Sequence, residues 1–360
     1  MALTHWLVMG DMSAFTIQRT AVAAADRSVL RPAALGRAIP AAERRQAPPA
    51  ISVVVPCLNE ATNLRLLLPR LEQVLQALSP RWEIIVVDDG STDDTSAVCV
   101  EWSHHAGVRA LLLSRNFGKE AALSAGLDAA AGDVVVLMDA DGQHEPEMIP
   151  ALLVPWQDGA DVVCTARSDR GSESVLKRLG TRLFYRLMRT GQRFHVIEDA
   201  GDFRLMDRTV VDALCSLPER TRFMKGLYAW VGFPTVIVPY HPATRQHGRT
   251  RFNLRGLASL SVIGLTAFTT WPLRAVSAVG FALALAAFGY GGLLALDYAI
   301  NGHAVSGWTT IVVGMALLSG VQLIALGVVG EYLSRVFDEV KSRPLYLVRR
   351  QLGVGLGAHA

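Results

Sequence analysis

Cysteine is scarce in this chain of 360 residues, which contains only 4 of them. Their scattered positions, without Cys-x-x-Cys spacing, argue against both a zinc site and a disulfide framework. They are Cys57, Cys99, Cys164 and Cys215. The histidines form no metal-binding spacing either, and we expect His144, His195, His241 and His247 to be surface loop residues. Chemistry on a reducing, cytoplasmic face fits this composition best.

Charge is also limited. The formal net charge is only +3, and no basic run is interleaved with aromatic residues, which argues against nucleic-acid binding. Charged residues make up 19% of the chain and hydrophobic residues 51%, so the chain is more apolar than an ordinary soluble enzyme. This composition predicts a globular part joined to membrane spans.

Two stretches, 275–296 and 304–330, contain no Asp, Glu, Lys or Arg. Each is long enough to cross a hydrocarbon core of roughly 30 Å. We predict a unit at 273–333 with two transmembrane helices, at about 275–296 and 308–330. A buried hairpin of a soluble protein is the alternative.

Arginine and lysine flank both spans, whereas the short connection at 297–307 has neither. By the positive-inside rule, both termini and the globular domain lie in the cytoplasm, and the protein is a multi-pass protein of the inner cell membrane. We further predict a flexible tail at 1–50, a basic loop and interfacial helix at 244–272, and a cytoplasmic tail at 334–360. The basic amphipathic stretch 176–188 fits either the bilayer surface or an ordinary surface helix.

Strands alternate with helices over 51–243. Apolar, mostly β-branched runs at 51–56, 83–87, 108–113 and 134–138 predict buried strands, and leucines at helical spacing over 64–78 predict the first helix. Further strands are expected at 161–165 and 236–240. Successive βα units of this length indicate an α/β fold with a mostly parallel sheet covered by helices on both faces.

Acidic residues follow two of these strands. Asp88 and Asp89 come after the second strand, and Asp139, Asp141 and Gln143 after the fourth. Ligands of open α/β sheets bind outside the carboxyl ends of the strands, where these side chains meet. Strand alternation places Asp139 and Asp141 on one side, and oxygen ligands suit Mg²⁺. An isolated Asp-x-Asp is weak, because surface turns are rich in Asp.

Several motifs in order resemble one family. SVVVP at 52–56, Asn59-Glu60, VDDGS at 87–91, Asp139-Ala140-Asp141 with Gln143, and two C-terminal spans resemble the inverting, membrane-anchored polyprenyl-phosphate glycosyltransferases of family 2. SRNFGKE at 114–120, AGDFRLM at 200–206 and RFMKGLYAWVGF at 222–233 look most like the bactoprenol glucosyltransferases, to which dolichol-phosphate mannose synthases are related. The resemblance extends over 51–350 and implies a GT-A (Rossmann-like) fold and a nucleotide-sugar donor.

The resemblance also implies roles for individual residues. Donor contacts fall on Pro56, Leu58, Glu60, Val87, Asp89, Asp139, Ala140 and Arg167. Asp139, Asp141 and Gln143 would hold Mg²⁺ or Mn²⁺, and Lys119, Arg245 and Arg251 would bind the acceptor and its phosphate. The catalytic set is Asp139, Asp141, Asp202 and Arg204, with Asp202 as either a base or a positioning residue. Plainer interpretations remain open, since Asp88 could only cap a helix and Arg251 could only flank a span.

The implied reaction moves a hexose, with glucose from UDP-glucose favoured, to undecaprenyl phosphate with inversion, for modification of cell-envelope glycans such as lipopolysaccharide. The expected partners are the nucleotide-sugar donor, the polyprenyl phosphate and the bilayer, with a homo-oligomer left open and no nucleic acid. Alternatives are mannose or an aminosugar as the transferred group, and a non-catalytic membrane scaffold with a degenerate transferase domain. A processive polysaccharide synthase is disfavoured because the Gln-x-x-Arg-Trp motif is absent.

Overall fold

The computed structural model describes residues 45, 47–167, 200–220, 222–240, 271–301 and 307–356. The chain divides into two units, Met1–Ala41 and Ala42–Ala360, and every described residue belongs to the second. Several predictions therefore lie outside the described residues. They concern most of the N-terminal tail, the amphipathic stretch 176–188, most of the basic loop and interfacial helix at 244–272, Arg245 and Arg251.

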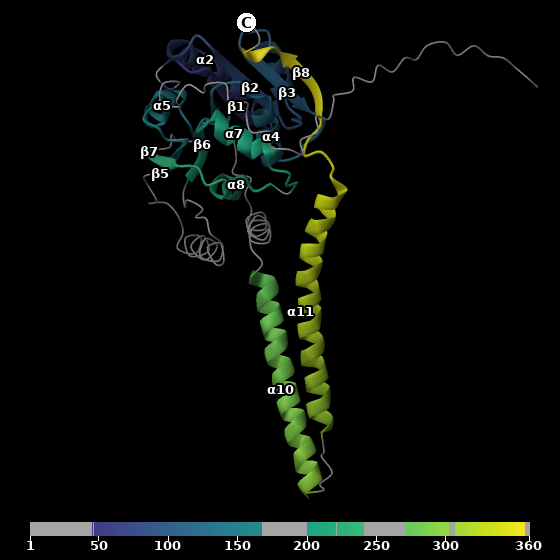
Figure 1. Ribbon diagram of the computed structural model, residues 1–360. Coiled ribbons are helices and arrows are strands. Elements are labelled where there is room, and N and C mark those ends of the chain that lie inside the picture. The colour runs from purple at the N-terminus through teal and green to yellow at the C-terminus, as the bar shows by residue number, and fades with distance from the viewer. Residues whose placement is uncertain are drawn as a thin grey trace, which may run out of the picture. The chain divides into compact units, whose positions relative to one another are not determined.

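An eight-stranded sheet forms the centre of the α/β domain (Figure 1), in the order β7-β5-β6-β4-β1-β2-β3-β8. The strands are β1 (Ile51–Cys57), β2 (Trp82–Asp88), β3 (Val108–Leu113), β4 (Val134–Leu137), β5 (Val162–Arg167), β6 (Ala200–Asp207), β7 (Thr235–Tyr240) and β8 (Val348–Gly353). The helices of this domain are α2 (Ala61–Leu78), α3 (Thr95–Trp102), α4 (Lys119–Ala129), the 3₁₀ turn η1 (Pro146–Met148), α5 (Ile149–Gln157), α7 (Arg208–Ser216) and α8 (Met224–Trp230). The predicted mostly parallel α/β sheet is confirmed.

Strand direction decides which side chains share an edge. β1 runs parallel to β2 and β4, β2 to β3, and β5 to β7, so their carboxyl ends meet at one edge of the sheet. β6 is antiparallel to both β4 and β5, with Arg204 opposite Leu137. This reversal brings the first residues of β6 to the edge where β4 ends. The sequence motif at 200–206 was recognised, but its strand was not predicted.

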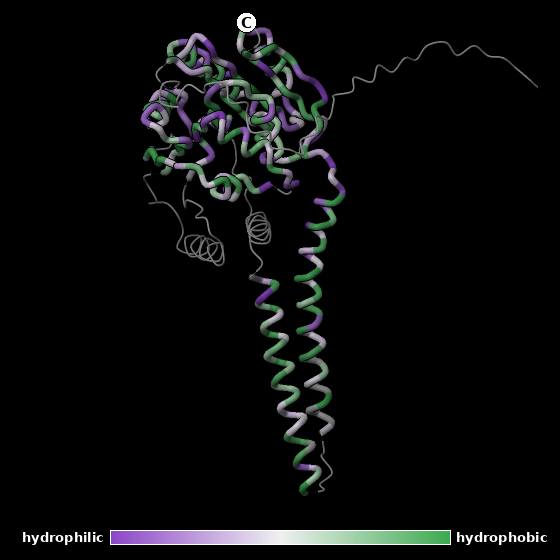
Figure 2. The backbone as a smooth tube through the Cα atoms, in the orientation of Figure 1, coloured by the Kyte–Doolittle hydropathy of each residue, from purple (hydrophilic) through white to green (hydrophobic). Residues whose placement is uncertain are grey.

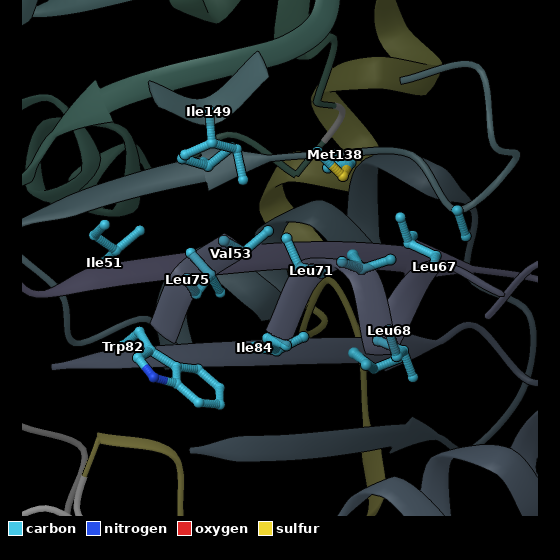
Figure 3. Close-up of a cluster of buried hydrophobic side chains, with 14 of the residues drawn as sticks. Ile51, Val53, Leu67, Leu68, Leu71, Leu75, Trp82, Ile84, Met138 and Ile149 are labelled. Atoms are coloured by element: carbon cyan, nitrogen blue, oxygen red, sulfur yellow. The ribbon is translucent and has the colours of Figure 1, made fainter. Parts of the chain in front are cut away.

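The buried side chains lie on both faces of the sheet. One face packs against α2, α3 and α5, and the other against α4, α7 and α8. Figure 3 shows leucines 67, 68, 71 and 75 of α2 beside Val53 and Ile84 of the sheet. Most of these side chains are fully buried, and each contributes about 1.5–3 kcal/mol relative to exposure. The leucine spacing that predicted α2 therefore corresponds to its core-facing side.

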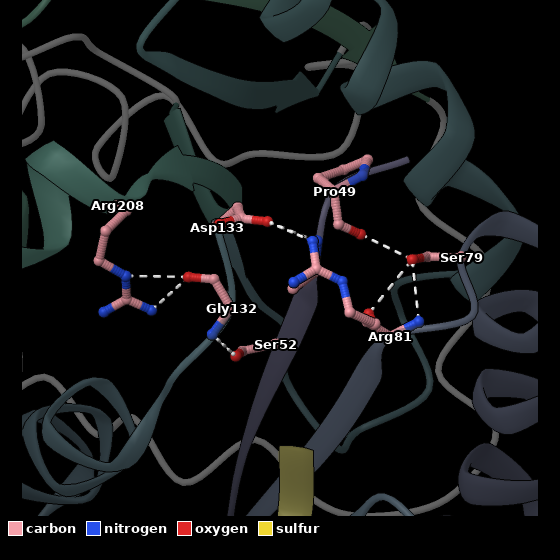
Figure 4. A network of polar contacts seen from close by, with 8 residues as sticks. Pro49, Ser52, Ser79, Arg81, Gly132, Asp133 and Arg208 are labelled. Carbon is pink, nitrogen blue, oxygen red and sulfur yellow. Dashed lines mark hydrogen bonds and ion pairs between the residues drawn. The ribbon is translucent and has the colours of Figure 1, made fainter. Parts of the chain in front are cut away.

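Polar contacts fasten the opposite edge of the sheet (Figure 4). The Gly132 N–H donates to Ser52 Oγ at 2.7 Å, and Arg208 donates from Nε to the Gly132 carbonyl at 2.9 Å. Ser52 Oγ in turn donates to the buried Glu83 carboxylate at 2.6 Å. These bonds fix the loop before β4, and with it the register that carries Asp139 to the functional edge.

Residues that follow α11 (Trp308–Lys341) return to the sheet, although 334–360 was predicted to be a cytoplasmic tail. β8 pairs antiparallel with β3, and Arg109 Nη2 donates to the Val354 carbonyl at 2.9 Å. The Leu356 N–H donates to Glu83 Oε2 at 3.1 Å, and the Ser114 N–H donates to the Leu347 carbonyl at 2.9 Å. Segment 346–356 is thus part of the α/β domain and not a free tail.

The last two helices, α10 (Trp271–Asn301) and α11 (Trp308–Lys341), are long and carry exposed apolar side chains. Figure 2 shows that hydrophobic residues predominate along both helices. By length and composition, Pro272–Ile300 and Leu317–Lys341 could each cross a membrane. The two apolar helices predicted from the charge-free stretches are therefore present.

Candidate active site

The turn after β4 carries the acidic motif. β4 ends at Leu137, before both aspartates. The prediction that strand alternation places Asp139 and Asp141 on one side is therefore wrong. A turn sets their directions instead. Asp141 Oδ1 accepts a hydrogen bond from the Gln143 N–H at 3.1 Å, and Gly142 has a φ of 72°, which glycine tolerates best. Gly142 therefore permits the turn that keeps Asp141 close to Gln143.

Lys119 joins this turn to β6. Its Nζ lies 2.7 Å from Asp139 Oδ1, 2.8 Å from Asp139 Oδ2 and 2.6 Å from Asp202 Oδ2. The three residues come from the start of α4, the turn after β4 and the start of β6, and the antiparallel pairing of β6 brings them together. Sequence analysis predicted all three as site residues but not their contact.

Electrostatics keeps these groups charged. Burial acts to lower the Lys119 pKa, but the Asp139 and Asp202 carboxylates outweigh it and hold the pKa above its usual range. Burial likewise acts to raise the Asp202 pKa, yet Lys119 and then Lys225 lower it to about 2. Asp202 is therefore ionised at neutral pH and can accept hydrogen bonds, whereas its low pKa makes it a weak base.

Glu120, next to Lys119, has different surroundings. Burial, reinforced by Asp202, raises the Glu120 pKa to about 7, although its Oε2 accepts a hydrogen bond from the Met224 N–H at 3.2 Å. A carboxyl group with this pKa can hold or release a proton near neutral pH.

Arg204 is a predicted catalytic residue that lies mainly within the protein. It is 4% exposed, its Cζ lies 3.6 Å from the ring centroid of Tyr228, and Nη2 donates to the Gly201 carbonyl at 2.8 Å. Its Nε has no hydrogen-bond partner in the described part of the chain. These contacts support a role in holding the start of β6, on which Asp202 sits.

Asp89 anchors the loop that leads to Lys119. Its Oδ1 accepts from the Phe117 N–H at 2.7 Å and its Oδ2 from the Gly118 N–H at 2.9 Å. Asp88, at the end of β2, instead accepts from the Ser91 N–H at 2.9 Å and from the Ser96 hydroxyl. Neither donor is a backbone N–H of α3, so Asp88 does not cap the following helix. The acidic pair after β2 thus organises two neighbouring loops.

The other predicted donor-binding residues also reach the functional edge. Pro56 pairs with Val87 across β1 and β2, and Arg167 ends β5. Pro56, Val87 and Ala140 are buried, so their side chains pack inside the domain next to this edge. Leu58 and Glu60 follow β1, where the Glu60 carboxylate accepts from Asn63 Nδ2 at 2.6 Å.

The prediction of a surface position for His144 is wrong. Its side chain is 6% exposed and packs against the rings of Phe203 and Tyr240, at centroid distances of 5.0 and 5.4 Å. Burial lowers the His144 pKa, although Asp139 and Asp141 oppose the shift. Nδ1 has no hydrogen-bond partner among the described residues. His144 is therefore a neutral group beneath the acidic turn.

The donor set after β4 fits a hard divalent cation. Among the described residues, no three His, Cys, Asp or Glu side chains converge on one point. Asp139, Asp141 and Gln143 nevertheless offer only oxygen ligands, which Mg²⁺ and Mn²⁺ favour, and substrate phosphates can supply the rest. Asp139 already forms an ion pair with the Lys119 ammonium group, so its position suits the binding of a cation.

Comparison with known proteins identifies the family. The family described as "Glycosyl transferase family 2" matches residues 52–215. The uncharacterized glycosyltransferase sll0501 of Synechocystis is 42% identical over 299 residues, covering 83% of this chain and 94% of that protein. The prophage bactoprenol glucosyl transferase homolog of Escherichia coli is 41% identical over 301 residues, covering 83% and 98%. The bactoprenol glucosyl transferase of Shigella phage SfII is 40% identical, covering 83% and 97%.

Solved structures resemble the α/β domain more distantly. A mannosyl-3-phosphoglycerate synthase from Rubrobacter xylanophilus has a TM-score of 0.45 and 20% identity, covering 65% of this chain and 77% of that one. A glucosyl-3-phosphoglycerate synthase from Mycobacterium tuberculosis, in complex with Mn²⁺, UDP and phosphoglyceric acid, has a TM-score of 0.40 and 24% identity, covering 61% and 77%. Because relatives that are 41–42% identical match 83% of its length, this chain is a glycosyltransferase and belongs to glycosyl transferase family 2.

Proposed function

We propose that this enzyme transfers a hexose from a nucleotide-diphosphate sugar to a polyprenyl monophosphate, with UDP-glucose and undecaprenyl phosphate as the favoured substrates. The relatives named as bactoprenol glucosyl transferases support the class of acceptor and sugar. The observation that carries the chemistry is the cluster of Asp139, Asp202 and Lys119 at the carboxyl edge of the sheet.

The residues have separate tasks in this mechanism. Asp139, Asp141 and Gln143 would hold Mg²⁺ or Mn²⁺, which stabilises the negative charge that develops on the leaving diphosphate. Asp89 keeps loop 114–118 in place beside the donor. Asp202 positions the acceptor, whose phosphate has a second pKa near 6 and is already largely ionised at pH 7. An oxygen of the acceptor phosphate attacks the anomeric carbon from the side opposite the diphosphate, the bond from that carbon to the diphosphate oxygen breaks, and the nucleoside diphosphate leaves, so the configuration is inverted.

The two apolar helices support a location in the cell membrane. Arginines and lysines flank both of them, so we propose that the catalytic domain and both termini are cytoplasmic. An anchored site raises the effective concentration of an acceptor that is confined to the same bilayer. The anchor thereby contributes to the rate of transfer.

The direct test is a transfer assay with the full-length protein in nanodiscs. Undecaprenyl phosphate is incubated with labelled UDP-glucose, GDP-mannose or a UDP-aminosugar, and the glycolipid is identified by mass spectrometry. We expect glucose transfer that is lost in Asp141→Asn and retained in Asp158→Asn, which changes an exposed carboxylate at the end of α5. Transfer that survives in Asp141→Asn would contradict the metal-binding role.

A scaffold with an inactive domain is the second candidate. It predicts no glycolipid from any donor, and no rise in the unfolding temperature with millimolar UDP and Mn²⁺. A transferase predicts both a glycolipid product and a rise in the unfolding temperature.

A further inference from the structure

The ammonium group of Lys119 lies between two carboxylates. Its Nζ donates hydrogen bonds to Asp139 Oδ2 at 2.8 Å and to Asp202 Oδ2 at 2.6 Å, and Asp139 Oδ1 lies 2.7 Å away in an ion pair. Since an ammonium group has three N–H donors, these contacts occupy most of its hydrogen-bonding capacity. To bind a phosphate with two or more N–H groups, Lys119 has to release at least one carboxylate.

Asp139 holds this ammonium with both of its oxygens, and these are the oxygens that a divalent cation would use. A metal ion and Lys119 therefore compete for Asp139. Asp202 is a separate anchor on β6, so Lys119 can leave Asp139 without losing its second partner.

The surroundings permit this movement. Side-chain exposure of Lys119 is 42%, and its flexible stem can change rotamer while the backbone stays fixed. The preceding Phe117 and Gly118 amides are held by Asp89. Only the side chain has to move.

We propose that Lys119 is a placeholder cation that neutralises Asp139 and Asp202 until a divalent ion binds at Asp139, and then keeps Asp202 while turning its freed N–H groups toward a substrate phosphate. This inference depends on the proposed function for the identity of the ion and of the phosphate. It explains why one lysine bridges two carboxylates that have different tasks. Without a cation between them, Asp139 and Asp202 would repel each other.

The test measures Mn²⁺ binding to the full-length protein in nanodiscs by electron paramagnetic resonance, without and with UDP. In Lys119→Met, Asp139 loses its competitor and one nearby positive charge, so we expect Mn²⁺ to bind on the order of tenfold more tightly. Lys119→Arg keeps the charge and should stay within about twofold of the wild type by the same reasoning. Sugar transfer should fall in Lys119→Met even though metal binding improves.

Lys225→Met is the matched control, because it removes the same charge from a lysine that influences Asp202 and has no described contact with Asp139. We expect less than about a twofold change in Mn²⁺ affinity for it. If Lys119 only held Asp139 in its binding position, Lys119→Met would weaken Mn²⁺ binding. The proposal would be overturned by weaker or unchanged Mn²⁺ binding in a Lys119→Met variant that keeps the wild-type unfolding transition. It would also be overturned if neither the wild type nor Lys119→Met bound Mn²⁺. Asp141→Asn separates the two levels, because unchanged Mn²⁺ binding there would overturn the metal site of the proposed function instead.

Discussion

Asp89 offers the sharpest test of how the site is built. Its two oxygens accept the Phe117 and Gly118 N–H groups at 2.7 and 2.9 Å, and the residue is 3% exposed. Asp89→Ala removes both acceptors. Each buried N–H left without a partner costs about 1–3 kcal/mol. Burial raises the Asp89 pKa against the opposing effect of these two amides, so the ionised wild-type group already carries a desolvation cost that alanine lacks. Two such groups correspond to about 2–6 kcal/mol, and we therefore expect a net loss in the lower part of that range, about 2–3 kcal/mol for the loop.

Hydrogen exchange measured by mass spectrometry on peptides covering 114–120 can detect this loss directly. A loss of about 2 kcal/mol corresponds to roughly thirtyfold faster exchange of the loop amides, without any ligand present. Asp93→Ala is the control, because the Asp93 carboxylate accepts a hydrogen bond from the Thr95 N–H at 3.0 Å in the neighbouring loop and has no described contact with residues 114–118. Unchanged exchange at 114–120 in Asp89→Ala would refute the anchoring role, and an effect seen only when UDP is added would favour a pure nucleoside contact.

Three further predictions concern stability, each measured by urea or thermal unfolding. Burial raises the Glu120 pKa from 4.5 to about 7 on folding, so ionisation of Glu120 opposes folding. The free energy of unfolding of the wild type therefore falls as the pH rises from 4.5 through about 7. Glu120→Gln should therefore be more stable than the wild type at pH 8, by at most about 2 kcal/mol after allowance for partial exposure, and should match it near pH 4.5; equal pH profiles would contradict this. Asp207 caps α7 through the Thr209 N–H at 3.0 Å and accepts from Trp156 Nε1 at 2.9 Å, so Asp207→Ala should lose about 2–4 kcal/mol. Burial acts to raise its pKa, but these bonds outweigh burial and lower it, so the wild-type advantage should shrink as the pH falls below 3.8 through the pKa of the folded state, and an advantage independent of pH would count against an ionised cap. A Cβ at Gly126 of α4 would overlap the Val54 side chain on β1, so Gly126→Ala should destabilise by about 1–3 kcal/mol and be partly rescued by Val54→Ala; a strictly additive pair would disprove the close approach.

The parallel strands could be predicted because the information is local. Runs such as 51–56 and 134–138 are continuous, apolar and β-branched, and polar turns follow them. β8 offers no such signal. Its sequence VRRQLG is largely exposed, and its place at the sheet edge depends on pairing with β3, which lies far away in the chain. A short, charged edge strand of this kind is defined by its partner more than by its own residues.

The candidate site divides in the same way. Motif order and resemblance were enough to name Asp139, Asp202 and Lys119, because each follows a recognisable strand or loop. Their mutual contact could not be predicted, because it requires β6 to run antiparallel to β4. His144 was misjudged for the same reason, since the rings that bury it come from β6 and β7.

The antiparallel strand creates the electrostatic problem that Lys119 resolves. By reversing direction, β6 brings Asp202 to the edge where β4 delivers Asp139, and the two carboxylates share one ammonium within 2.8 Å. Both proposed substrates add negative charge, a diphosphate on one side and a lipid phosphate on the other. The acids can serve such substrates only if cations balance them at each stage. A lysine on a flexible, partly exposed stem provides that balance before substrates arrive, whereas the buried Arg204 is held by the Gly201 carbonyl and the Tyr228 ring. The division between one mobile cation and one fixed cation therefore follows from which of the two side chains the fold buries.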